Sequence, residues 1–93
     1  MDLSLEMSLT REDFLRLLPG AVGLAEVAEQ EGVFGASMGG RQWTMRLWPL
    51  PDRRLGSVVL PRHRVDISLV GYTEEEAAAF LARFHRGFQR GGG

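Results

Sequence analysis

Two histidines, His63 and His85, are the residues best suited to acid–base chemistry or metal binding in this sequence. A zinc site needs three or four ligands that converge, and neither the H-x-x-x-H nor the H-E-x-x-H spacing occurs. His63 lies between Arg62 and Arg64, whose charge disfavours a bound cation. We therefore interpret both histidines as surface or boundary residues and predict no metal site.

Nucleophiles and cofactor motifs are equally scarce. The chain has no cysteine. Only Ser37 has the G-x-S-x-G spacing, and the Gly39-Gly40 pair that follows it predicts a hairpin turn instead of the strand-to-helix turn of a nucleophile elbow. The glycines between positions 32 and 40 match neither a phosphate-binding loop nor a dinucleotide fingerprint, and they are typical of turns instead. The acids Glu12 and Asp13 are neighbours on one expected helix, so they point in different directions. The sequence thus predicts no enzymatic activity and no cofactor.

Arginine supplies all of the positive side-chain charge, because lysine is absent. Nine of the 11 arginines follow residue 40, whereas residues 1–40 carry seven acids and two arginines. A planar guanidinium suits a carboxylate or a phosphate. A coding bias toward arginine explains the composition more simply, and uneven charge also suits an intramolecular fit.

Apolar and polar residues alternate over residues 41–48 and 64–70, which predicts two strands with one buried side. The predicted buried set is Trp43, Met45, Leu47, Val65, Ile67 and Leu69. The opposite, polar side holds our candidate interaction surface, which consists of Gln42, Thr44, Arg46, Trp48 and Arg64. An exposed tryptophan often anchors an interface. Trp48 could equally fold back against the loop that follows it.

Turn residues separate the expected strands. Gly39-Gly40 predicts a tight hairpin, because both central positions of the favoured turn need positive φ. The proline-rich residues 49–53 predict a loop, and Pro61-Arg62 is expected to interrupt the chain again. The predicted strands are residues 2–8, 33–38, 41–48, 55–60 and 64–70.

Capping boxes mark two helices. Thr10 begins the first, and Pro19-Gly20 is predicted to end it. Thr73 begins the second, in which apolar residues recur at helical spacing toward the C-terminus. Residues 21–32 leave open a short helix, a strand or an irregular connection, of which we favour a helix or loop.

These elements predict an α+β fold of order β-α-β-β-β-β-α. We expect a two-layer sandwich, in which a mainly antiparallel meander sheet of four or five strands carries two helices on one face. Residues 1–90 are expected to form a single domain, and residues 91–93 a flexible glycine tail. No stretch approaches the roughly 20 apolar residues of a membrane helix, and the first residues lack a secretory pattern. We therefore expect a cytoplasmic protein.

The leading functional hypothesis is a small accessory or protein-interaction domain without catalytic activity. The expected partner is another protein or a second copy of this chain, because 93 residues bury a modest core. The alternative is an anion-, nucleotide- or nucleic-acid-binding module that uses the arginines of the sheet face. A sheet that binds RNA carries aromatic residues on neighbouring strands, and this pattern is missing. Neither nucleic acid nor a membrane is therefore an expected partner.

Overall fold

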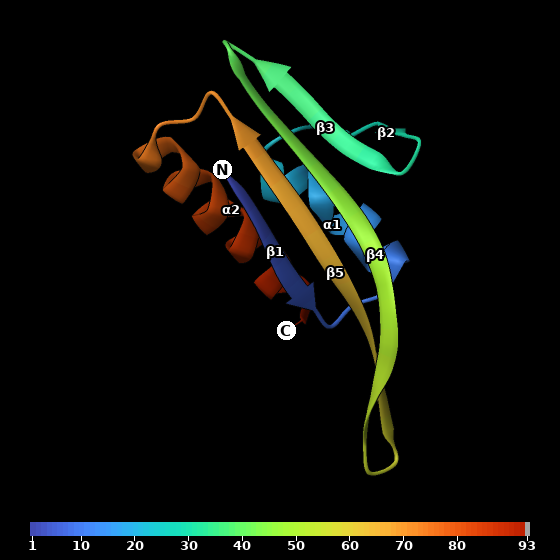
Figure 1. The fold of residues 1–93 in the computed structure, drawn as a ribbon. Coiled ribbons are helices and arrows are strands. Elements are labelled where there is room, and N and C mark those ends of the chain that lie inside the picture. Colours follow the sequence, from blue (N-terminus) through green and yellow to red (C-terminus); the bar gives the residue numbers. More distant parts are fainter. Residues whose placement is uncertain (93) are drawn as a thin grey trace.

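An antiparallel sheet of five strands forms one layer of the fold, and two helices cover one of its faces (Figure 1). The computed structural model describes residues 1–92, with side chains described through residue 89. The elements in chain order are β1 (Asp2–Met7), α1 (Arg11–Val22), β2 (Glu29–Gln30), β3 (Val33–Met38), β4 (Arg41–Leu55), β5 (Val58–Val70) and α2 (Glu74–Gly92). Within the sheet the strand order is β1-β5-β4-β3-β2. The predicted α+β sandwich and its element order are confirmed.

Alternation along the strands decides which side chains enter the core. Directly paired residues share a face, so Met45 opposite Ile67 and Leu47 opposite Val65 build the side that the helices cover. The predicted inward set is confirmed, with Leu47 half-buried and the others buried. Strand β1 pairs with β5 and adds apolar side chains to the same side. The sheet therefore has one apolar face and one polar face.

Phenylalanine side chains join the helices to the sheet. Phe14 on α1 stacks on Phe88 of α2 at a ring-centroid distance of 5.4 Å, and its edge meets Phe34 of β3 at 5.5 Å. Phe84, which is fully buried, lies 4.7 Å from Phe88. Such contacts between rings add to the stability gained by burying their area. The core is thus a slab between the sheet and both helices.

Both predicted N-caps are present. The Thr10 hydroxyl accepts a hydrogen bond from the Asp13 amide at 3.1 Å. Thr73 and Glu76 form a full capping box, with the Glu76 amide donating to the Thr73 hydroxyl at 3.1 Å and the Thr73 amide donating to the Glu76 carboxylate at 2.9 Å. These bonds satisfy amides that the first helical turn leaves without partners.

The first helix ends later than the sequence predicted. Pro19 lies inside α1, which continues to Val22 and ends at Gly23 in the left-handed conformation with φ of 76°. The reason is tertiary packing, since Ala21 is buried against α2. A side chain on Gly87 of α2 would place its Cβ 2.6 Å from the Ala21 Cα. This close helix seam outweighs the hydrogen bond that proline removes.

The predicted loop at 49–53 and the predicted break at Pro61-Arg62 are both wrong. Strands β4 and β5 run unbroken through them as one long hairpin, with a β-bulge between Leu50 and Arg53. Strand β3 covers the outer edge of β4 only as far as Arg46, and β1 covers the outer edge of β5 only from His63 onward. Proline is tolerated in a strand that has a free edge, so the prolines here do not end the strands.

The remaining features of the fold are the turn between β3 and β4, the segment 21–32 and the C-terminal glycines. The Gly39-Gly40 turn has positive φ at both glycines, which confirms the predicted hairpin. The undecided segment 21–32 begins with the last turn of α1 and contains the two-residue strand β2. Helix α2 takes in Gly91 and Gly92 of the expected tail, and Gly93 lies outside the described residues. No helix in the described range is both long and apolar enough to cross a bilayer.

Candidate functional site

The face of the sheet opposite the helices carries every residue of the candidate interaction surface. We call it the open face. Its outward side chains include Asp2, Ser4 and Glu6 from β1, Arg62, Arg64, Asp66, Ser68 and Val70 from β5, Gln42, Thr44, Arg46 and Trp48 from β4, and Val33 and Ser37 from β3. The register sets this surface, because cross-strand partners project to the same side.

The five candidate residues are not all brought together. Trp48 is paired directly with Arg64 on β5. Arg46 precedes Trp48 by two residues on β4 and therefore projects from the same face, so these three side chains form a cluster. Thr44 is the next outward-facing residue of β4 and lines a hollow beside the cluster. Gln42 lies at the far end of β4, where its partner is Val70. The cluster of arginine and tryptophan is therefore the centre of the site.

Asp66 holds this cluster in place. Its carboxylate accepts hydrogen bonds from the Ser4 hydroxyl at 2.6 Å and from the Trp48 indole Nε1 at 2.8 Å. It also accepts two from the Arg64 guanidinium, at 3.1 and 3.2 Å. The hydrogen bond from Ser4, followed by those from Trp48 and Arg64, lowers the pKa of Asp66. The carboxylate is thus committed to holding its neighbours and is not a free acid or base.

Alternation over residues 64–70 puts Asp66 on the polar side of its strand, but it does not indicate that this carboxylate binds donors from other strands. Its donors come from three strands, and Ser4 lies 62 residues away in the chain. The available signal was local: an acid between Arg64 and Ser68 in a regularly alternating strand. That pattern predicts a cross-strand ion pair, yet it does not reveal which strand supplies the other donors.

Trp48 lies over the sheet rather than against the following loop. The indole donates to Asp66 across on β5, and the ring centroid lies 5.4 Å from the Arg64 Cζ and 5.9 Å from the Arg46 Cζ. Both distances suit a cation–π contact. The side chain remains 40% exposed. Trp48 is therefore a fixed, half-open apolar surface with its one polar atom already satisfied.

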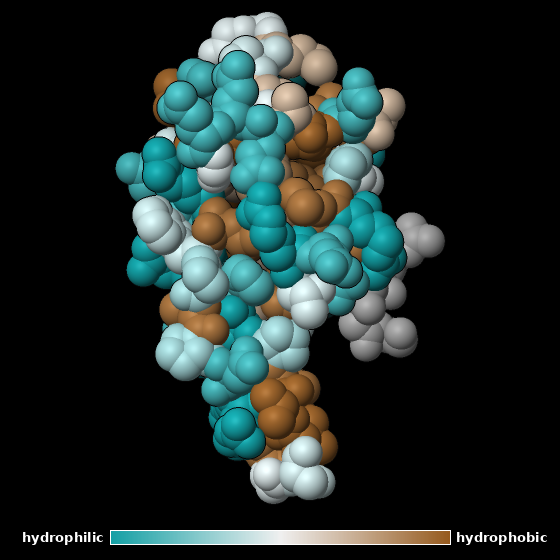
Figure 2. Space-filling view, turned by 90° about the vertical axis from the view of Figure 1, so that its right-hand side faces the viewer, coloured by the Kyte–Doolittle hydropathy of each residue, from teal (hydrophilic) through white to brown (hydrophobic). Residues whose placement is uncertain are grey.

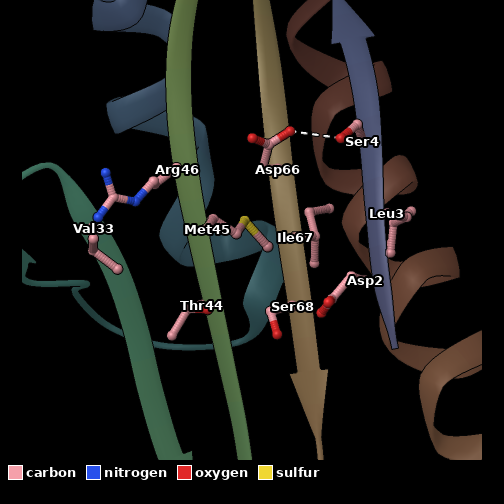
Figure 3. Close-up of a pocket in the computed structure, with 10 residues that line it drawn as sticks. All are labelled: Asp2, Leu3, Ser4, Val33, Thr44, Met45, Arg46, Asp66, Ile67 and Ser68. Carbon is pink, nitrogen blue, oxygen red and sulfur yellow. Dashed lines mark hydrogen bonds between the residues drawn. The ribbon is translucent and has the colours of Figure 1, made fainter.

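Arg46 differs from the other arginines of the open face. Arg62 pairs with Glu6 at 3.5 Å and Arg64 pairs with Asp66 at 3.1 Å, whereas Arg46 forms no ion pair with any described residue. In Figure 3 its guanidinium extends across toward Val33 on β3, away from Asp66. Its charge is thus available to a ligand.

A shallow hollow of about 560 Å³ lies beside Arg46. Short hydroxyl side chains from three adjacent strands line it, namely those of Ser4, Thr44 and Ser68 (Figure 3). Asp2 lies on its rim, and the backbone around Met45 and Ile67 forms its floor. The hollow can offer hydrogen bonds to an extended polar segment, and its openness suits a surface contact more than enclosure of a small molecule.

Charges on the open face balance. The three cations Arg46, Arg62 and Arg64 meet the three acids Asp2, Glu6 and Asp66. Such a face has no net field to attract a polyanion from a distance. No group of three metal-ligating side chains occurs within the described range. His63 lies on the helix side of β5, where its Nδ1 is 2.9 Å from the Leu9 carbonyl oxygen. The open face therefore offers an indole, a guanidinium and hydroxyl groups that can contact a ligand.

Searches of protein-family models, curated proteins and solved structures found no match to this chain.

Proposed function

We propose that this protein is a small interaction domain without catalytic activity, and that its open face binds a carboxylate-bearing segment of another protein. The observation that carries the proposal is an exposed indole, held in place by Asp66, beside a guanidinium that has no acidic partner among the described residues. Trp48 supplies apolar area and Arg46 supplies charge, and the two side chains lie in contact. Tryptophan and arginine are the residues that most often dominate binding energy at interfaces.

The chemistry of the face indicates what the segment contains. A guanidinium binds a carboxylate through two parallel hydrogen bonds, so an Asp or Glu side chain suits Arg46. The hydroxyls of Thr44 and Ser68 can bond polar groups on either side of it. An extended segment lying along β4 would reach the indole and the hollow together. A protein segment therefore fits the mixture of apolar, cationic and hydroxyl groups better than a phosphate ligand does.

An anion- or nucleic-acid-binding module remains the second candidate, because it would use the same free cation. Two features count against it. The acids of the face cancel its arginine charge, so little counterion release is available to drive binding. Trp48 also has two guanidinium groups over or beside its ring, which hinder stacking of a base.

The test compares Arg46→Glu with the matched reversal Arg86→Glu, which changes an exposed arginine on α2. Proteins retained by the wild type are identified, purified and titrated against all three forms. We expect Arg46→Glu to weaken the purified complex by roughly tenfold or more, and Arg86→Glu to leave it unchanged. Trp48→Ala should weaken it as well, since it removes the apolar anchor.

Two results would contradict the proposal. One is a purified complex that Arg46→Glu and Arg86→Glu affect equally. The other is salt-sensitive micromolar binding of labelled DNA or RNA that Arg46→Glu abolishes, which would favour the second candidate.

A further inference from the structure

The hairpin of β4 and β5 extends well beyond the rest of the fold. We call residues 50–61 the arm. Neither β3 nor β1 pairs with this part of the hairpin, so the arm is a two-stranded ribbon with both edges free. In Figure 1 it projects below the sheet and both helices, and it gives the molecule its long dimension of 47 Å against 27 and 24 Å. A two-stranded ribbon in water is marginally stable by itself.

The tip of the arm exposes apolar side chains on both of its faces. Leu55 and Val58 are direct partners and share one face, while Val59 projects to the other. Leu55 and Val58 are each 52% exposed to solvent, and Val59 is 45% exposed. Figure 2 shows this hydrophobic cluster near the narrow end of the molecule, next to hydrophilic side chains. Arg53 and Arg54 adjoin it in the sequence, and neither forms an ion pair with a described residue.

A groove of complementary character lies at the base of the arm, between β1, α1 and the C-terminal half of α2. We call it the acid-rimmed groove. Its volume is about 350 Å³. Apolar walls come from Leu5, Met7, Leu9, Leu17 and Phe88. The acids Glu6 and Asp13 lie on its border, with carboxylates that are 67% and 48% exposed. Their existing partners Arg62 and Arg16 form only exposed ion pairs, which contribute little stability.

We propose that the arm tip of one copy docks in the acid-rimmed groove of a second copy, and that the exchange is reciprocal. Each chain carries both halves of the contact: an apolar plug flanked by arginines and an apolar groove bordered by carboxylates. A twofold axis uses both pairs at once and closes the assembly at a dimer. The contact shares Glu6 with the edge of the open face but uses neither Arg46 nor Trp48, so it stands or falls separately from the proposed function.

The length of the arm suits this arrangement. The groove begins where the arm begins, since Met7 is paired with His63 and the Ser8 hydroxyl donates to the Pro61 carbonyl at 3.3 Å. From Leu50 to Leu55 the ribbon spans roughly 17 Å at about 3.3 Å per residue. If two arms lie side by side in opposite directions and overlap completely, each tip reaches the base of the other copy. There it meets the groove.

The first experiment is sedimentation equilibrium of the full chain over a wide concentration range, with a matched pair of valine variants. Val58→Asp places a charge on the arm tip, whereas Val70→Asp places it at a similarly exposed valine near the other end of β5. We expect a wild-type dimer, a dissociation constant raised roughly tenfold or more by Val58→Asp, and little change with Val70→Asp. Circular dichroism of both variants should remain native, because both side chains are exposed.

The second experiment reverses the charges. Arg53→Glu with Arg54→Glu should weaken the dimer, as should Glu6→Arg with Asp13→Arg. All four changes in one chain should restore most of the affinity, because the pairing is then inverted but complementary. A general apolar association would not show this rescue.

Three outcomes would overturn arm exchange. They are a wild-type monomer at high micromolar concentration, equal weakening by Val58→Asp and Val70→Asp, and no rescue in the fourfold variant. None of them bears on the Arg46→Glu test of the open face.

Discussion

The body of the sheet and the arm are built from the same two strands, yet they follow different rules. On β5, Val65 is fully buried beneath the helices, whereas Val58 is 52% exposed in the arm. Within the body, the helix-facing side of these strands is apolar and the open face is mostly polar. In the arm, the consecutive residues Val58 and Val59 place apolar side chains on both faces.

This difference separates two reasons for a residue to be hydrophobic. In the body, apolar and polar residues alternate because one face of the sheet packs against the helices and the other faces solvent. No described part of the chain covers the arm tip, so its hydrophobicity is not explained by the fold of one copy. Contiguous apolar side chains on an exposed ribbon commonly mark an interaction surface. The inner half of the hairpin therefore contributes to the core of one copy, whereas the outer half has the exposed apolar surface on which the proposed arm exchange depends.

The largest expected effect comes from making the same substitution in both halves. Val65→Ala removes two buried methyl groups and should lower the free energy of unfolding by about 2–3 kcal/mol. Val58→Ala should change it by less than about 0.5 kcal/mol, because that side chain is exposed in the single copy. Chemical denaturation at a concentration low enough to keep the chains monomeric would measure both. Equal losses would show that the arm is part of the folded core.

The seam between the helices gives the next test of the body. Gly87→Ala should cost about 1–3 kcal/mol, since the new Cβ would lie 2.6 Å from the Ala21 Cα and force the helices apart. Gly20→Ala is the control, because it lies on α1 with nothing within 4 Å of its new Cβ. It should raise stability by roughly 0.5–1 kcal/mol through helix propensity. Thermal unfolding that shifts in the same direction for both would contradict a close seam.

A smaller loss is expected at the start of α2. Thr73→Ala removes the hydroxyl that accepts the Glu76 amide, and should cost about 0.5–2 kcal/mol. Thr73→Ser keeps the hydroxyl and should retain most of the stability. Urea denaturation of the three proteins compares them directly, and a loss in Thr73→Ser as large as in Thr73→Ala would argue against capping.

Much of the body was predictable because its signals are local. Apolar residues that recur at every second position mark the buried face of a strand. This alternation correctly predicted the core-facing side chains of β4 and β5, from Trp43 to Leu69. Capping boxes span four residues and were equally reliable. The polar side of the alternation also placed Arg46, Trp48 and Arg64 on one face.

What could not be predicted depends on residues that are distant in the sequence. Pro19 looked like the end of α1 because the seam that extends the helix involves Gly87, on the other helix. Pro61 looked like a strand break because a free edge depends on where the neighbouring strand stops. The acid-rimmed groove has walls from β1, α1 and α2, so no single segment of the sequence reveals it.

The smallest expected effect lies on the open face of the body, in the hydrogen bonds around Asp66. Hydrogen bonds from Ser4, Trp48 and Arg64 lower the pKa of Asp66 below its ordinary value of 3.8 in the folded state. A carboxyl with a lowered folded pKa binds protons more readily in the unfolded state, so its contribution to stability is complete above pH 3.8 and is lost as the pH falls below that value. Asp66→Asn removes this dependence.

The wild type should therefore be more stable than Asp66→Asn at neutral pH, with a gap that narrows as the pH falls below about 4. Denaturant midpoints of the two proteins from pH 7 to pH 3 would measure it, and Asp52→Asn on the exposed arm is the matched control. A gap of constant size across this range would mean that the asparagine lowers stability for a reason other than lost charge. A gap that narrows for Asp66 and not for Asp52 would show that the carboxylate that fixes Trp48 stabilises the fold through its charge, whereas the carboxylate on the arm does not.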